Sequence, residues 1–239
     1  MEKELIEAVK NGDLTKTVSL LKRGIDIHYG DDEFLKQAVL YFRLNIVKYL
    51  IENGADIKKI GSIALYSASI HNDLNTMKYF IEKGVDINDG FRALCEASNL
   101  GHIEIVKYLV KNGVKISQNN NAAIISAVSC SDSNNLEIVK YLVKYGANIR
   151  ARNDIALVVA CRFGNKEIAK YLIDLGANIN VYDNCVIKYA ATYGDINFIK
   201  YLIKKGAKSS VLKPEIQKEL GEKIPFMRIN GYGKTIAQY

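Results

Sequence analysis

The apolar residues of this chain lie in pairs of short stripes that recur about every 30 residues. In the first stripe of each pair a leucine or isoleucine precedes an alanine by three residues, as Leu35 precedes Ala38. The second stripe has the spacing of Ile46, Val47 and Leu50. Apolar side chains spaced by three and four residues lie on one face of a helix. The pattern therefore predicts repeated units of helix, turn and helix.

A glycine follows the second stripe of each unit and sets the period of the repeat. These residues are Gly24, Gly54, Gly84, Gly113, Gly146, Gly176 and Gly206. Their successive spacings are 30, 30, 29, 33, 30 and 30 residues. Glycine adopts a left-handed backbone conformation without steric cost, so each of these glycines is expected to end its helix in that conformation.

Neither helix of a unit can bury its apolar stripe alone, so the seven units are expected to stack on one another. The sequence thus predicts an all-α solenoid, a continuous array of seven repeats over residues 2–210. Residues 211–239 are expected to form a cap helix and a tail.

The two ends of the predicted array differ from its inner units. Lys16 and Thr17 replace an apolar pair, and Ser209 replaces an isoleucine, as expected for end faces that contact water. Residues 214–220 predict a helix that caps the last repeat, because proline is favoured in the first turn of a helix. The remaining tail, residues 224–239, lacks periodicity and is expected to be partly disordered.

The unit endings and one second stripe resemble ankyrin repeats. The endings read GADI or GANI, and residues 101–110 read GHIEIVKYLV. This resemblance covers about residues 2–210. The sequence KYLIENGADI is moreover similar to the repeats of ankyrin families in giant DNA viruses that infect amoebae. The finer resemblance implies a viral protein whose partner is a host protein.

Departures from the ankyrin pattern change the expected details. The family period is about 33 residues, and most units here are shorter between the glycine and the next alanine, which predicts short β-turn fingers. The one spacing of 33 residues comes from an insertion near residues 131–135, which predicts an outward loop. No unit begins with Thr-Pro-Leu-His, so the hydroxyl and imidazole hydrogen bonds that join consensus repeats are expected to be absent.

Composition indicates a folded protein of the cell interior. The chain is 49% hydrophobic and 25% charged, and no apolar stretch is long enough to span a bilayer. Cys95, Cys130, Cys161 and Cys185 lie far apart, in no disulfide or metal-ligand pattern. We expect a monomeric cytoplasmic protein without membrane attachment. The viral resemblance implies that this cytoplasm is that of the host cell.

No residue pattern predicts catalysis, a metal site or a cofactor. His28, His71 and His102 lack a cysteine or a second histidine at ligand or triad spacing. His102 is expected to make a hydrogen bond within the turn before the second helix of its repeat. The GYGK run at residues 231–234 lacks the strand, the glycine spacing and the Ser/Thr of a phosphate loop. The chain is therefore predicted not to be an enzyme.

A lysine and a tyrosine recur together in six second stripes. The pairs are Lys48-Tyr49, Lys78-Tyr79, Lys107-Tyr108, Lys140-Tyr141, Lys170-Tyr171 and Lys200-Tyr201. With the net charge of +7, such a ladder on the convex side could follow a polyanion and stack nucleic-acid bases. The favoured interpretation is structural, with tyrosine at a seam between helices, its hydroxyl in water, and lysine on the outer face. Nucleic-acid binding stays an alternative.

The ankyrin resemblance implies a protein partner on the concave side, which is formed by the fingers and the ends of the first helices. Carried over by register, the residues predicted to bind the partner are Tyr41, Phe42, Ile70, His71, Leu100, Arg162, Phe163 and Tyr193. Aromatic and arginine side chains are typical interface anchors. The leading hypothesis is a non-catalytic scaffold for protein–protein interaction. A substrate adaptor for a ubiquitin ligase is an alternative, because some viral ankyrin proteins end in an F-box-like segment, although the tail from Pro214 is short for that module.

Overall fold

The computed structural model describes residues 1–129, 135–221, 228–229 and 235–236. Residues 1–151 and residues 152–239 form two compact units, and each is described by itself. Both are built from helix pairs, as the apolar pattern predicts.

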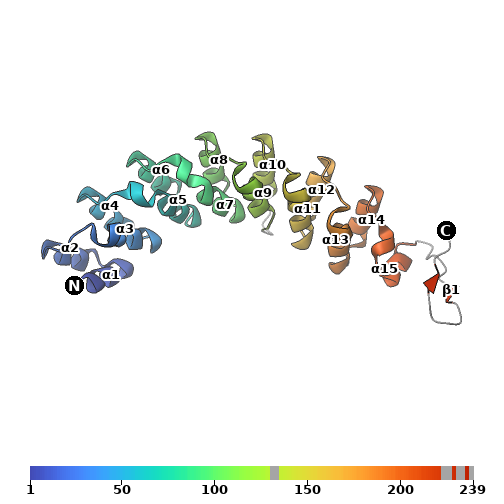
Figure 1. Ribbon diagram of the computed structural model, residues 1–239, viewed down its shortest axis with the longest axis horizontal. Helices are drawn as coiled ribbons and strands as arrows, with labels where there is room; N and C mark the ends of the chain where they lie inside the picture. Colours follow the sequence, from blue (N-terminus) through green and yellow to red (C-terminus); the bar gives the residue numbers. More distant parts are fainter. Residues whose placement is uncertain (130–134, 222–227, 230–234, 237–239) are drawn as a thin grey trace. The chain divides into compact units, whose positions relative to one another are not determined.

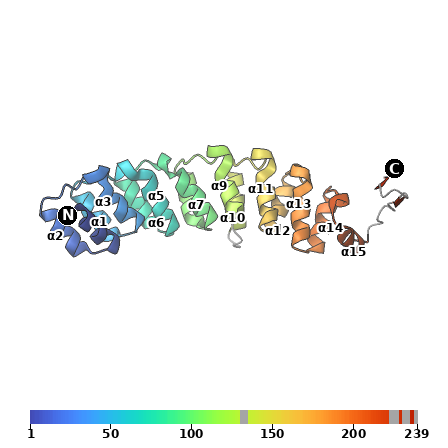
Figure 2. The ribbon, with the colours of Figure 1, turned by 60° about the horizontal axis from the view of Figure 1, so that its bottom comes forward.

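The first unit contains five helix pairs. Its elements are α1 Glu2–Asn11, α2 Leu14–Lys22, α3 Tyr29–Leu40, α4 Leu44–Glu52, η1 Ile57–Ile60, α5 Gly61–Ile70, α6 Leu74–Glu82, η2 Ile87–Gly90, α7 Phe91–Asn99, α8 Ile103–Lys111, α9 Gln118–Ser129 and α10 Asn135–Lys144. Figures 1 and 2 show its first helices (α1, α3, α5, α7 and α9) side by side in one row and its second helices in another. Successive first helices contact each other directly, as α5 contacts α7 and α7 contacts α9.

The second unit contains two further pairs and the end of the array. Its elements are α11 Ala151–Arg162, α12 Lys166–Asp174, α13 Val181–Thr192, α14 Ile196–Lys204, η3 Ser209–Val211, α15 Pro214–Glu219, β1 Arg228–Ile229 and β2 Thr235–Ile236. The two short strands pair antiparallel within the tail. Most of the predicted loop near 131–135, the GYGK run and the rest of the tail lie outside the described residues.

The second helices end as the repeat glycines predict. The φ angles of the seven glycines lie between 90° and 106°. At the end of α4, the N–H of Gly54 donates to the carbonyl of Ile51, and the N–H of Ala55 donates to the carbonyl of Leu50. These two bonds satisfy carbonyl groups that have no partner inside the helix. The predicted left-handed helix ends are confirmed.

The core consists of the residues that define the apolar pattern. Leu35 and Ala38 of α3 are fully buried, as are Val47 and Leu50 of α4. The alanine adds only a methyl group, so the next first helix can approach closely. The corresponding pairs in the other repeats are buried as well: Leu5 and Ala8, Leu65 and Ala68, Leu94 and Ala97, Ile124 and Ala127, Leu157 and Ala160, Ile187 and Ala190.

The fingers between repeats are short, as predicted, but they take two forms that the β-turn expectation does not describe. Asp56 and Asp86 each cap a short 3-10 helix, η1 or η2, by accepting a backbone N–H two residues later. In four other fingers three consecutive residues adopt left-handed conformation, with φ between 44° and 62°: residues 30–32, 119–121, 152–154 and 182–184.

The last left-handed residue of each such finger is an aspartate or asparagine, the residue types that tolerate this conformation best after glycine. These residues are Asp32, Asn121, Asp154 and Asn184. The Oδ1 atom of Asn121 accepts the backbone N–H of Asn148 at 2.8 Å, and that of Asp154 accepts the N–H of Asn178 at 3.2 Å. Because each donor belongs to the following finger, these bonds join neighbouring repeats.

A second set of bonds between repeats starts just before the second helices. The Nε atom of Arg43 donates to the carbonyl of Lys10 at 2.8 Å, and the Nδ1 atom of His102 donates to the carbonyl of Ser69 at 2.8 Å. The turn bond predicted for His102 is therefore wrong, because its acceptor lies in the preceding repeat. The expectation that hydroxyl and imidazole hydrogen bonds between repeats are absent is wrong as well, because the His102 imidazole makes one and the Ser67 hydroxyl donates to the carbonyl of Val39 at 2.7 Å.

The N-terminal end face is less polar than predicted. Thr17 is fully buried, and its hydroxyl donates to the carbonyl of Asp13 at 2.7 Å. The prediction that Thr17 faces water is wrong, because this bond satisfies the hydroxyl inside the helix pair. Lys16 is exposed as expected and pairs with Glu4 at 3.0 Å.

The helix predicted at residues 214–220 is present as α15. It begins at Pro214 and lies about one repeat period after α13 along the chain. Gln217 thus takes the register that Ile187 has in α13, and it is buried with its Nε2 atom donating to the carbonyl of Leu212 at 2.7 Å. A polar residue can occupy this apolar position because its amide is satisfied by the backbone.

Candidate functional site

Exposed apolar side chains recur at the ends of the first helices. They are Leu40, Tyr41, Ile70 and Leu100 in the first unit and Phe163 and Tyr193 in the second, each between 37% and 54% exposed. With the exposed His71 in the first unit and Arg162 in the second, these residues make up what we call the first-helix ledge of each unit. Each apolar member lies two or three residues after the repeat alanine, where the buried part of the helix ends.

All the residues that sequence register predicts for partner binding are exposed except Phe42, which is half-buried. Phe42 has a φ of 53°, in the left-handed region that Gly12, Gly101, Gly164 and Gly194 occupy at the same position of their repeats. Its ring stacks on that of His71, with centroids 3.8 Å apart and an interplanar angle of 5°.

This stack joins the ledge residue His71 to Phe42 of the preceding repeat. His71 is held in place because its Nδ1 atom donates to the carbonyl of Ser67 at 2.9 Å. A phenylalanine in left-handed conformation is strained, and such strain persists only where surrounding contacts compensate for it. Next to it, the Lys10 ammonium lies 5.8 Å from the centroid of the Tyr41 ring. The aromatic residues at the N-terminal part of the ledge are thus ordered by contacts between repeats.

In the second unit Tyr193 reaches back to the preceding repeat. Its hydroxyl donates to the carbonyl of Arg162, and its ring lies over Gly164, where an added Cβ atom would be 3.6 Å from the ring. Below the ring is a cavity of about 220 Å³ lined by Cys161, Gly164, Lys166, Ala190, Tyr193, Asp195 and Phe198. Lys166 and Asp195 form an ion pair in its wall. The cavity is suited to a small apolar side chain rather than to a cofactor.

Sequence register missed one pair in the first unit, formed by the exposed Arg92 and the half-buried Tyr66. The guanidinium of Arg92, at the start of α7, lies 4.9 Å from the centroid of the Tyr66 ring on α5. Tyr66 precedes the ledge residue Ile70 by one helical turn. The spacing of four residues between Tyr66 and Ile70 could have indicated this extension of the ledge, because residues so spaced share a helix face.

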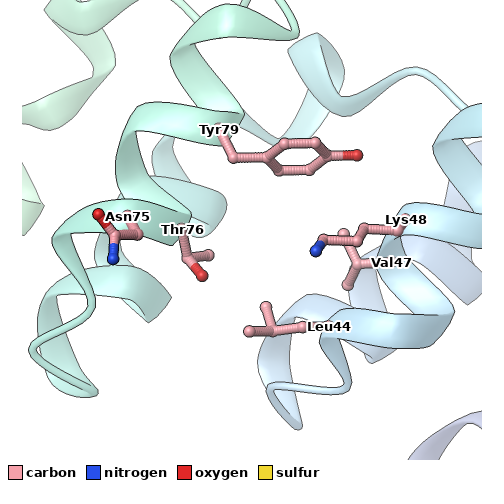
Figure 3. A pocket seen from close by; sticks show the side chains of 6 residues that line it. All are labelled: Leu44, Val47, Lys48, Asn75, Thr76 and Tyr79. Atoms are coloured by element: carbon pink, nitrogen blue, oxygen red, sulfur yellow. The ribbon is translucent and has the colours of Figure 1, made fainter.

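The lysine and tyrosine pairs interleave between second helices. Lys48 of α4 lies 5.7 Å from the ring centroid of Tyr79 on α6, beside a cavity of about 130 Å³ (Figure 3). The Tyr79 hydroxyl is buried without a hydrogen-bond partner, so the prediction that the hydroxyl reaches water is wrong at this position. Burial and the nearby Glu52 raise the pKa of Tyr79.

In each unit, lysines of other second helices contact carboxylates. Lys107 lies 3.1 Å from Glu104 and 3.2 Å from Glu137, which raise the pKa of its ammonium group through hydrogen bonds. Lys170 pairs with Glu167 at 2.9 Å. Ammonium groups already paired in this way offer little to a phosphate backbone. The contacts of the lysines therefore favour the structural interpretation of the ladder.

The helix pairs match a family model described as ankyrin repeats in three copies, at residues 5–89, 65–153 and 127–212. The chain belongs to the ankyrin repeat family. No curated protein sequence matches this ankyrin chain. The crystal structure of the human ASB11 ankyrin repeat domain is similar, with a TM-score of 0.65, 23% sequence identity, and coverage of 85% of this chain and 98% of that one. This likeness establishes the all-α ankyrin fold.

Cys161 of the ankyrin array is a buried cysteine. Burial raises the pKa of the Cys161 thiol to about 12, so this cysteine is protonated and unreactive at neutral pH. No group of three or more histidine, cysteine, aspartate or glutamate residues could hold a metal ion in the described ranges. Among the described helices, none is both long and apolar enough to cross a membrane.

Proposed function

We propose that this ankyrin protein is a non-catalytic scaffold that binds a protein partner through the first-helix ledge. The observation that carries the proposal is that exposed apolar side chains recur at one register of the repeats in both units. The chain also belongs to a repeat family whose members generally bind proteins. Exposed apolar residues that gather in this way mark interaction surfaces more often than scattered ones do.

The residues of the ledge have the chemistry of interface anchors. Tyr41, Phe163 and Tyr193 are aromatic, and truncation of such residues at an interface typically costs about 2 kcal/mol or more each. Ile70 and Leu100 add aliphatic surface beside His71. A partner that buries these side chains gains apolar contact without requiring a change in the core of either unit.

The test compares two sets of substitutions in the full chain. The ledge set combines Ile70→Ser, Leu100→Ser and Phe163→Ala, and the control set combines Lys107→Gln, Lys140→Gln and Lys170→Gln. Proteins captured by the parent chain are identified by mass spectrometry, and binding of each purified candidate is measured by calorimetry. Circular dichroism spectra and melting temperatures of the variants confirm folding.

We expect the ledge set to weaken binding by tenfold or more and the control set to leave it nearly unchanged. If the control set abolished binding while the ledge set did not, polyanion binding through the lysine ladder would replace this proposal. Steep salt dependence and binding to generic DNA would accompany that result.

The finer predictions about biology belong to the same proposal. The resemblance of the KYLIENGADI sequence to viral ankyrin families supports a viral source, a host-protein partner and action in the host cytoplasm. We also propose that the chain is a monomer. Size-exclusion chromatography with light scattering tests the last point. No contact in the described residues favours the ubiquitin-ligase adaptor, which would use the chain from Pro214 onward.

A further inference from the structure

Arg92 places a guanidinium against an aromatic ring on the row of first helices, whereas Lys48 and Lys78 contact rings on the second helices. It is exposed, it lies on the row of first helices, and its guanidinium is placed over the ring of Tyr66 from the neighbouring repeat. Within the described residues it forms no ion pair, whereas Lys59 and Lys107 each contact two carboxylates. The guanidinium is therefore positioned by an aromatic ring but not neutralised.

A guanidinium held over an aromatic ring can bind a planar anion with little rearrangement. Contact with the ring face restricts the side chain, while the N–H groups stay in the plane of the guanidinium and can donate outward. A carboxylate can accept two of these bonds in parallel. Because the arginine is already ordered by Tyr66, little conformational entropy is lost on binding.

The pair is continuous with the ledge. Ile70 follows Tyr66 by one turn on α5, and Leu100 follows Arg92 by eight residues at the end of α7. At a rise of about 1.5 Å per residue, Arg92 and Leu100 are about 12 Å apart along the helix. An extended peptide spans that distance with about four residues.

We propose that Arg92 and Tyr66 form the charge-selective part of the ledge and bind a carboxylate side chain of an extended partner segment. An apolar side chain about four residues from that carboxylate packs on Ile70 and Leu100. This inference rests on the proposed function and adds to it the chemistry of the partner.

Neighbouring charges disfavour a polyanion at Arg92. Asp89 lies three residues before Arg92, and Glu96 lies four residues after it on α7. Neither forms an ion pair with Arg92 in the described structure. Both would repel the closely spaced phosphates of a nucleic acid, while one carboxylate aimed at the guanidinium can avoid them.

The test uses a displayed library of random 12-residue peptides selected on the full chain. Enriched peptides are synthesised, and their dissociation constants are measured for the parent chain and for Arg92→Gln, Arg92→Lys and Tyr66→Leu. Arg23→Gln is the matched control, because it removes an exposed arginine at the end of α2, away from the ledge. Thermal unfolding shows whether each variant retains its fold.

We expect enriched peptides to share an acidic residue and an apolar residue about four positions apart. Arg92→Gln should weaken their binding by about tenfold or more, the effect of one charge-assisted hydrogen-bonded pair. Arg92→Lys should recover only part of it, because an ammonium cannot bind a carboxylate in the same forked geometry. Tyr66→Leu should weaken binding as well, and Arg23→Gln should not.

Two results would separate failure of this inference from failure of the proposed function. If the peptides lose binding in Ile70→Ser and Leu100→Ser but not in Arg92→Gln, the ledge binds proteins and the role of Arg92 is refuted. If neither the ledge substitutions nor Arg92→Gln affects the enriched peptides, both proposals are refuted. Enrichment of basic peptides, or tighter binding of generic DNA, would also overturn the inference.

Discussion

Replacement of Asn121 by alanine tests whether the left-handed fingers stabilise the stack of repeats. Asn121 has a φ of 62°, and its Oδ1 atom accepts the N–H of Asn148 in the next finger at 2.8 Å. Alanine in this conformation costs about 1 kcal/mol more than asparagine, which tolerates it. Loss of the hydrogen bond costs about 1 kcal/mol more. We therefore expect Asn121→Ala to lower the free energy of unfolding by about 2 kcal/mol.

Asn120 provides the matched control because it is exposed and has a φ of 53°. Asn120→Ala should carry the backbone cost alone, about 1 kcal/mol. Asn121→Gly should remove that cost but lose the bond, for a net loss of about 1 kcal/mol. Asn121→Asp should retain most of the stability, since Asp154 plays the same part in the second unit.

The free energies are measured by guanidinium titration followed by circular dichroism, with the slope of each transition compared between variants. Hydrogen exchange at the Asn148 amide gives a local measure, and this amide should exchange faster in Asn121→Ala and Asn121→Gly but not in Asn120→Ala. Equal stability of Asn120→Ala and Asn121→Ala, with unchanged exchange at Asn148, would refute the role assigned to the bond.

Three further predictions concern other contacts. Phe42→Gly should be more stable than Phe42→Ala by about 1 kcal/mol in thermal unfolding, because both lose the stack on His71 but only glycine relieves the left-handed backbone. Burial alone would raise the pKa of Asp32, but hydrogen bonds from Lys59 and His28 lower it, so its stabilising effect is present above about pH 4 and is lost as the pH falls through the lowered value. Lys59→Met should therefore lower stability at pH 7 and reduce its loss between pH 4 and 2 in an acid titration. Removal of residues 214–239 should lower the melting temperature and the solubility, since Leu212, which is buried next to Gln217, then contacts water; unchanged values would refute the cap.

The architecture could be predicted because each decisive feature is a local rule repeated seven times. The position of Gly54 ends a helix by backbone conformation alone, and the stripe of Ile46, Val47 and Leu50 determines which face is buried. The fingers could not be predicted in the same way. Three successive left-handed residues, as at 119–121, oppose the intrinsic preference of the backbone, and contacts with the next finger stabilise them.

Exposure of the ledge was predictable from register, but contacts between repeats were not. Arg92 and Tyr66 are 26 residues apart in the sequence, so no helical spacing connects them. The same holds for His102, whose acceptor Ser69 lies 33 residues away. A residue can be assigned to a helix face from the period alone, but its partner on the next repeat depends on the distance and tilt between helices, which packing determines.

Tyr193 makes a stabilising contact between repeats as well as being proposed to bind the partner, whereas Phe163 is proposed only to bind the partner. The Tyr193 hydroxyl bonds the preceding repeat, so an alanine there removes a contact that orders two repeats as well as an exposed ring. Phe163 is 49% exposed, and within the described part of the chain its ring forms no aromatic stack and no cation–π contact. Phe163→Ala should thus weaken partner binding at an unchanged melting temperature, while Tyr193→Phe should lower the melting temperature and retain the ring that a partner would contact. If Phe163→Ala had no effect on binding while Tyr193→Phe weakened it, the ledge would act on the partner through the order of the repeats rather than by direct contact.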